Sequence, residues 1–199
     1  LEQGWNEEIP AYIDRTKRSA LLASEIMKLS DIVEAHNGGY VPFKPELDAV
    51  IKLGQGDDVV EAITGALLRT DPSLPSVGVP THQQLQQRFE SMRKNVLRAE
   101  YTPPHSGFVG RAFGVVLGSL AIPEIGLVDG DTVDARLARA KYFMKTELLE
   151  DAINEIERLP RSQLNNTYSW LGDAHRRSSV VQAIQVLKLH VDTAFPDKS

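Results

Sequence analysis

Residues 81–100, THQQLQQRFESMRKNVLRAE, have the pattern of a basic amphipathic α-helix, and the interpretation of the whole chain depends on this segment. Thr81 and Gln84 form a capping box at its start, and Pro80 prevents an earlier helix from running through it. At 100° per residue, one apolar stripe forms, and its members are Leu85, Phe89, Met92, Val96 and Ala99. The segment therefore predicts a helix with one apolar face.

Basic side chains border this stripe and leave two interpretations open. Arg88 and Arg93 lie on its two flanks, and Lys94 and Arg98 lie further round the helix. The stems of flanking arginines cover apolar surface while their heads reach phosphates, which favours a helix lying in a membrane interface. An apolar stripe edged by arginine is equally typical of a core helix in a soluble bundle.

Composition describes an ordinary globular chain. Of its 199 residues, 42% are hydrophobic and 25% are charged, which is enough for a sizeable core in one or two domains. The absence of cysteine excludes disulfides, thiolate catalysis and cysteine-ligated zinc. A net charge of −5 argues against a nucleic-acid binder that works through global charge, so a polyanion partner requires a local basic patch.

Two segments bear on membrane topology. Residues 1–10 lack a basic region followed by an apolar run, so they form neither a signal peptide nor a transit sequence, and we expect the chain to be a fragment of a longer protein. The most apolar segment, residues 107–128, holds only eleven consecutive uncharged residues before Pro123. Such a run is too short to span a bilayer.

Glycine and proline divide the chain into helical segments, and no sustained period-2 alternation is present, so the fold class predicted is all-α. Residues 1–70 are expected to form an N-terminal helical arm, with a helix opened by Pro10 and running toward His36. Further helices are expected over residues 46–53 and after Asp57, which acts as a cap. Residues 71–80 contain three prolines and are predicted to form a linker.

Residues 81–121 are expected to form an amphipathic membrane-binding segment that includes a second helix from Ser106 to about Ala121. Gly110, Gly114 and Gly118 recur every four residues within it and give a smooth strip that a helix or a lipid surface can approach closely. The alternative for Gly107 to Gly118 is a partly irregular loop with apolar anchors.

Residues 131–195 have the clearest pattern, that of a bundle of short amphipathic helices. The four expected stripes are Val133, Leu137, Ala140 and Met144; Leu149, Ala152, Ile153 and Ile156; Leu164, Tyr168 and Leu171; and Val180, Ile184, Leu187 and Val191. Asp131 and Asp134 are interpreted as the negative N-terminus of the first helix.

Motifs for catalysis and metal binding are missing from the sequence. The DGDTVD run at residues 129–134 is similar to a calcium loop, but Asp134 stands where an EF-hand needs glycine and Ala140 where it needs glutamate. The five histidines are scattered without metal spacing, and neither a phosphate loop nor a dinucleotide fingerprint occurs. We therefore predict a protein that is not an enzyme and that uses no cofactor or metal.

Four segments, in this order and spacing, carry a resemblance to a known family. They are LDAVIKLGQGDDVVEAITGALL, LQQRFESMRKNVLRAE, LARAKYFMKTELLEDAINEIERL and WLGDAHRR. Together with the Arg88-Phe89 pair they resemble the C-terminal region of mitofilin, the core subunit of the MICOS complex at mitochondrial crista junctions. The likeness extends from about Leu47 to Leu189. The glycine-rich residues 107–118 depart from the family pattern, in which bulkier side chains are expected.

This resemblance implies a membrane-shaping scaffold of the mitochondrial inner membrane, on the intermembrane-space side, with a transmembrane helix and coiled coil outside this chain. It implies that residues 84–98 bind and bend anionic membrane, with cardiolipin as the expected lipid. The membrane-binding residues would be Arg88, Phe89, Met92, Arg93, Lys94 and Arg98. It also implies that the mitofilin-type bundle docks a CHCH-domain subunit of MICOS. The partner-binding residues, expected to be exposed, would be Arg139, Tyr142, Phe143, Trp170 and Arg176.

Self-association into a homo-oligomer is expected to strengthen a membrane contact that one helix makes only weakly. Nucleic acid is not an expected partner. The alternative interpretation is a helical protein-protein adaptor without direct membrane contact, in which the basic helix is buried core and the glycine strip packs against a partner helix.

Overall fold

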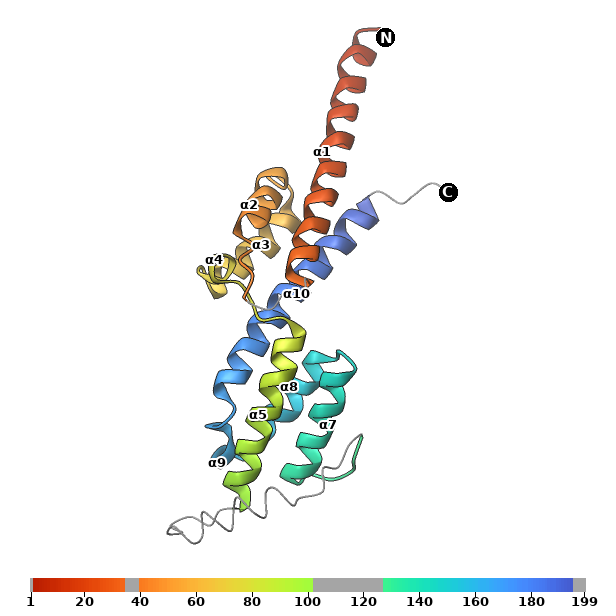
Figure 1. Cartoon of the computed structure of the whole chain (residues 1–199). Helices are drawn as coiled ribbons and strands as arrows, with labels where there is room; N and C mark the ends of the chain where they lie inside the picture. The colour runs from red at the N-terminus through yellow and green to blue at the C-terminus, as the bar shows by residue number, and fades with distance from the viewer. Residues whose placement is uncertain (1, 35–39, 102–126, 195–199) are drawn as a thin grey trace. The chain divides into compact units, whose positions relative to one another are not determined.

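The computed structural model describes residues 2–34, 40–101 and 127–194 (Figure 1). These residues form nine α-helices and no β-strand, which confirms the all-α class predicted from the sequence. The chain divides into two compact units, one made of residues 1–79 and 179–199 and the other of residues 80–178. This division differs from the boundaries expected from the sequence, since residues 179–199 group with the N-terminal arm and not with the rest of the C-terminal bundle.

The first unit contains α1 (Glu2–Glu34), α2 (Lys44–Leu53), α3 (Asp58–Thr70), α4 (Leu74–Val77) and the second part of α10 (Tyr168–Ala194). Its core joins α1 to α2, α3 and α10. The buried apolar residues of α1 and α10 are Leu22, Ile26, Leu29, Val33, Val180, Ile184, Leu187 and Val191. Helix α1 begins before Pro10, so the prediction that this proline opens the helix is wrong.

Asp57 caps α3 as predicted. Its side chain accepts hydrogen bonds from the backbone N–H groups of Val59 and Val60, at 3.0 and 3.2 Å. These bonds satisfy two of the N–H groups that the first turn of a helix leaves without a partner. The turn before α3 therefore has a local explanation in the sequence.

Gly78 allows the segment between α4 and α5 to approach the N-terminal part of the chain. Val79 pairs with Val41 in an isolated antiparallel bridge. Gly78 has a φ of 84°, and a Cβ atom at this position would lie only 2.4 Å from the carbonyl oxygen of Val41. Only glycine fits here, because both the backbone conformation and the close contact exclude a side chain.

The second unit contains α5 (His82–Tyr101), α7 (Val133–Lys145), α8 (Leu149–Glu157), α9 (Arg161–Leu164) and the first part of α10. The helices expected from the stripes beginning at Val133 and Leu149 are confirmed. The two later stripes do not form separate helices, since α10 runs unbroken from Tyr168 to Ala194 after the short α9. The predicted helix from Ser106 and the glycine strip lie outside the described residues.

The caps of α5 and α7 show how closely local sequence fixes helix starts. Gln84 N–H donates to the hydroxyl of Thr81 at 3.2 Å, and Thr81 N–H donates to the Gln84 side chain at 2.9 Å, which confirms the capping box. Helix α7 has the acidic start expected from the sequence, since Asp134 lies in its first turn. The cap itself is Thr132, which accepts from the N–H of Ala135 at 3.2 Å, while Asp131 pairs with Arg136.

The turn between α7 and α8 holds a glutamate in the left-handed conformation. Glu147 has a φ of 62° and is the only non-glycine residue with a positive φ among the described residues. The N–H of Leu148 donates to the carbonyl of Phe143 at 2.9 Å, which is the hydrogen bond of a Schellman motif. This conformation costs roughly 1–2 kcal/mol for a residue with a Cβ atom.

Replacing this glutamate by glycine is expected to stabilise the protein. Glu147→Gly removes the left-handed penalty, partly offset by roughly 0.5–1 kcal/mol for the greater freedom of glycine in the unfolded chain, so we expect a gain of about 0.5–1 kcal/mol. Urea unfolding followed by circular dichroism measures it. Thr146→Gly is the matched control, because Thr146 has a φ of −96° and gains nothing from glycine. Equal destabilisation by both substitutions would contradict the prediction.

Candidate functional site

The apolar stripe of α5 is part of the core of the second unit from Leu85 to Val96, whereas Ala99 is exposed. Leu85, Phe89, Met92 and Val96 are between 0 and 6% exposed. The ring of Phe89 meets that of Trp170 edge to face, with centroids 5.5 Å apart, and the indole N–H of Trp170 donates to the carbonyl of Leu85 at 2.9 Å. In this structure the stripe therefore packs as the core-helix interpretation requires, and Phe89 and Met92 are not presented to a membrane surface.

Trp170 does not have the exposure expected of a partner-binding residue. It is 2% exposed, so the prediction of an exposed indole is wrong. Burial is favourable here because the large ring covers Phe89 and its single polar atom finds a backbone acceptor on α5. Trp170 thus joins α5 to α10 within the second unit.

The basic residues of α5 differ in their exposure and in their distance from the apolar stripe. Arg88 forms an ion pair with Asp173 at 2.5 Å and donates to the hydroxyl of Ser169 at 3.3 Å. Arg93 contacts Glu90 at 3.4 Å. In contrast, the side chains of Lys94 and Arg98 are exposed. The two residues nearest the stripe are therefore held by carboxylates, and the two further round the helix face solvent.

Glu90 connects α5 to α7. Its carboxylate forms ion pairs with Lys141, at 2.9 Å, and with Arg93. Partial burial raises the pKa of Glu90, but the hydrogen bond and charge of Lys141 and the charge of Arg93 outweigh it, so the pKa lies below the ordinary glutamate value. Glu90 is thus ionised at neutral pH and holds both cations on one edge of α5.

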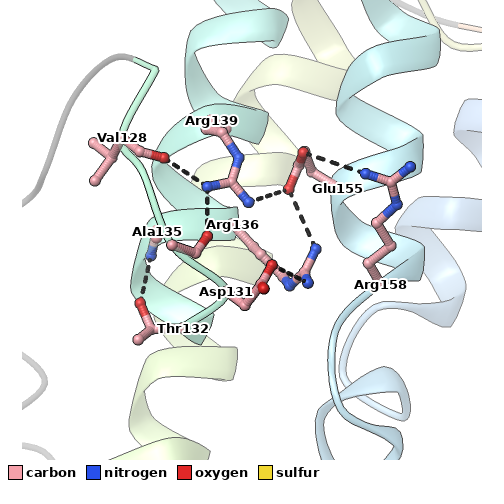
Figure 2. Close-up of polar contacts among 9 residues, drawn as sticks. Val128, Asp131, Thr132, Ala135, Arg136, Arg139, Glu155 and Arg158 are labelled. Carbon is pink, nitrogen blue, oxygen red and sulfur yellow. Dashed lines mark hydrogen bonds and ion pairs between the residues drawn. The ribbon is translucent and has the colours of Figure 1, made fainter.

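Arg139 of α7 fastens the loop that enters its own helix (Figure 2). Its Nη1 group donates to the carbonyl oxygens of Val128 and Gly130, at 2.6 and 2.8 Å. Its Nη2 group donates to Glu155 of α8 at 2.8 Å. This hydrogen bond is the main cause that raises the pKa of the Arg139 guanidinium, against the lowering effect of burial. Arg139 therefore has a role inside the fold, unlike the exposed partner contact expected from the sequence.

Glu155 is the centre of this cluster. It is 8% exposed, and besides Arg139 it lies 3.7 Å from Arg136 and 3.9 Å from Arg158 (Figure 2). Arg136 also pairs with Asp131 at 2.7 Å. Sequence reasoning missed Glu155. A signal was present, because this glutamate lies three residues after Ala152, at the edge of the apolar face of α8.

The other predicted partner residues are more accessible. The rings of Tyr142 and Phe143 meet edge to face at 5.8 Å, both residues are partly buried, and Phe143 packs against the core. The side chain of Arg176 is 52% exposed and lies 3.6 Å from Asp173. Exposed Leu148 follows at the same end of α7 as Tyr142. Tyr142, Phe143 and Leu148 thus leave apolar surface at the end of α7, and Arg176 is an accessible cation on α10.

Metal and membrane-spanning features are missing from the part of the chain that the structure describes. Its histidine and acidic side chains nowhere gather in a group of three or more able to hold a metal ion. Every helix in the described ranges is too short or too polar to cross a membrane. The described residues thus define an all-α protein whose charged clusters hold helices together.

Comparison with known proteins gives the family. The family model for mitofilin, described as a mitochondrial inner membrane protein, matches residues 13–192. Because this match spans most of the sequence, the chain belongs to the mitofilin family. No solved structure matches the chain.

Curated relatives agree with this family. The MICOS complex subunit MIC60 of Sordaria macrospora is 29% identical over 188 residues, which cover 94% of this chain and 26% of that protein. The corresponding protein of Penicillium rubens is 27% identical over 188 residues, covering 94% and 28%. That of Neosartorya fischeri is 30% identical over 147 residues, covering 74% and 23%. The chain thus spans about a quarter of the length of these relatives.

Proposed function

We propose that this chain is part of a MICOS subunit that serves as a scaffold at crista junctions, on the intermembrane-space side of the mitochondrial inner membrane. The observation that carries the proposal is the mitofilin match over residues 13–192, supported by relatives named as MICOS subunits. Ion-paired helices with a buried core suit a scaffold, and no catalytic role is proposed. Membrane contact, membrane bending and partner docking extend this proposal.

The membrane contact that the energies favour is peripheral. Insertion of Leu85, Phe89 and Met92 into a membrane would first remove them from the core, so the roughly 1.5–3 kcal/mol that each gains from burial would be exchanged and not added. Each Lys or Arg near an anionic surface contributes about 1 kcal/mol, and a docked helix already has this attraction. Since insertion adds little to it, we propose that α5 stays docked and that Lys94 and Arg98 contact anionic headgroups, with cardiolipin as the expected lipid. Arg88 and Arg93 add positive charge to this surface while they remain in their ion pairs.

Bending of a membrane follows from many such contacts. A single chain with a few basic residues binds weakly, so self-association is proposed to raise the effective concentration of the second and later contacts. An array of α5 surfaces would then hold one leaflet against a curved scaffold. Phe89 and Met92 contribute by keeping the helix in place.

Reversing the exposed charges of α5 is expected to weaken vesicle binding. In co-sedimentation with cardiolipin-containing vesicles at low salt, Lys94→Glu/Arg98→Glu should reduce the bound fraction at least about tenfold, because two attractions of about 1 kcal/mol each become repulsions. Binding of the native chain should also fall as salt rises. A variant at Phe89 is a poor test, since it disturbs the core.

The matched control changes the same net charge elsewhere. Lys17→Glu/Lys52→Glu reverses two exposed lysines of the first unit and should leave sedimentation nearly unchanged. If both double variants lose binding equally, global charge and not α5 is responsible. If the native chain does not sediment at low salt, the membrane contact is refuted.

Docking of a CHCH-domain subunit is proposed on the second unit. The accessible part of the expected surface is Tyr142, Phe143 and Arg176, with Leu148 beside the end of α7. Aromatic and arginine side chains are both enriched among the hot spots of protein interfaces. Arg139 and Trp170 would act on this surface only by holding the helices beneath it.

The burial of the α5 stripe also favours the alternative function, a helical adaptor without direct membrane contact. In that case Lys94 and Arg98 would contact an acidic protein surface. The sedimentation experiment separates the two, because an adaptor leaves cardiolipin vesicles unbound at low salt and still binds its protein partner.

A further inference from the structure

A pocket of about 360 Å³ lies in the first unit, among α1, the turn between α2 and α3, and the second part of α10. The buried Leu22 and Val191 and the half-buried Leu53 give it apolar walls. Two arginines of α1, Arg15 and Arg18, lie at its edge. The pocket therefore combines apolar surface with a cationic rim.

Arg18 is fixed in position by the end of α2. Its Nε group donates to the carbonyl of Leu53 at 2.8 Å, and its Nη2 group donates to the carbonyl of Gln55. A guanidinium carries five N–H donors, so these two bonds leave the Nη1 edge for a further acceptor. Because the fold already holds this arginine in one orientation, binding of an anion costs less conformational entropy.

The single carboxylate that lines the pocket, that of Asp57, already accepts hydrogen bonds from protein groups. Asp57 accepts from the backbone of α3 at its Oδ1 atom, and its Oδ2 atom receives His190 Nε2 at 2.8 Å. Arg15 and Arg18 also line the pocket, so its arginines outnumber its one carboxylate and the lining attracts an anion. A singly charged carboxylate meets less repulsion from Asp57 than a phosphate dianion does.

We propose that this pocket binds the carboxylate of a short aliphatic chain, with the carboxylate between Arg15 and the Nη1 edge of Arg18 and the chain on Leu22, Leu53 and Val191. Arginine suits a carboxylate because its planar fork donates two parallel hydrogen bonds. The volume is at the lower end of the range for small-molecule sites, which matches a small ligand. The carboxylate belongs to a free amphiphile or to the C-terminus of a peptide that ends in an aliphatic residue.

Calorimetric titration of the whole chain tests this site with octanoate as the probe. Octanoate is expected to bind saturably, whereas acetate, which lacks the chain, and octanol, which lacks the charge, should bind at least about tenfold more weakly. A peptide ending in leucine, compared with its C-terminal amide, identifies the source. Tighter binding of the free-acid peptide than of octanoate indicates a chain terminus, and weaker binding indicates a free amphiphile. Absence of saturable binding by both octanoate and the peptide overturns the proposal.

Two variants on the same helix place the binding site. Arg15→Gln should weaken octanoate binding about tenfold through loss of one charged hydrogen bond. Lys17→Gln makes the same change of charge at an exposed position outside the pocket and should have no effect. Equal effects of the two variants overturn the assignment. Since Arg15 is exposed and has no role in the core, its variant is expected to keep the native circular dichroism.

Discussion

Phe89→Ala is expected to destabilise the protein by about 3–5 kcal/mol. Phe89 is 1% exposed and lies at the centre of the core of the second unit, where its ring meets Trp170 edge to face. The substitution removes the apolar surface of the ring, leaves a cavity that the surrounding helices fill only partly, and loses an aromatic contact of about 0.5–1.5 kcal/mol. Urea unfolding followed by circular dichroism measures the change.

Leu148→Ala is the matched control for this prediction. Leu148 is 48% exposed in the same unit, so its loss should cost less than about 1 kcal/mol. If Phe89→Ala costs no more than Leu148→Ala, the ring is not part of the core, and the apolar stripe of α5 is free to insert into a membrane.

Glu155→Gln is expected to cost about 2–4 kcal/mol, near the range for breaking a buried ion pair. The side chain of Glu155 is 11% exposed, and those of Arg139 and Arg136 are 15 and 14% exposed. Without the carboxylate these guanidinium groups remain partly buried and lose their charged partner. The amide still accepts one hydrogen bond, which keeps the expected cost below that of a full deletion.

The local effect of Glu155→Gln should appear in the loop that Arg139 fastens. Amide hydrogen exchange over residues 128–131 is expected to speed up more than exchange in α5. Glu157→Gln is the control on the same helix. The side chain of Glu157 is 48% exposed and pairs with the exposed His175, so its replacement should change stability by less than about 0.5 kcal/mol. Unchanged exchange at residues 128–131 in Glu155→Gln would contradict the role given to this carboxylate.

Helix positions could be predicted from the sequence wherever local chemistry decides them. The capping box of Thr81 and Gln84 and the cap of Asp57 are confirmed because each involves residues at most three positions apart. The single long α10 was not predicted, because the stripe that ends at Leu171 and the stripe that begins at Val180 were assigned to two helices. Gly172 lies between them, but a glycine inside a helix costs only about 1 kcal/mol, and packing outweighs it.

The surroundings of the candidate site could not be predicted, because they depend on helices that are distant in sequence. An amphipathic stripe has the same sequence pattern whether a membrane or a protein core covers it. Only the contact with Trp170, 85 residues after Leu85, shows that protein covers α5. Glu155 was missed for the same reason, since Arg139 and Arg136 reach it from another helix. Lys94 and Arg98 were expected on the polar side of the helix, and both are exposed there.

The most direct test of a peripheral contact made by a docked α5 is the fluorescence of Trp170 on the membrane. The chain has two tryptophans, so Trp5→Phe leaves Trp170 as the single reporter beside Phe89. With the protein bound to cardiolipin vesicles that carry bromine on their acyl chains, we expect the emission to keep its native wavelength and to be unquenched. Quenching by the bromine together with a shifted emission would show that α5 leaves the core and inserts, and would contradict the peripheral contact proposed here.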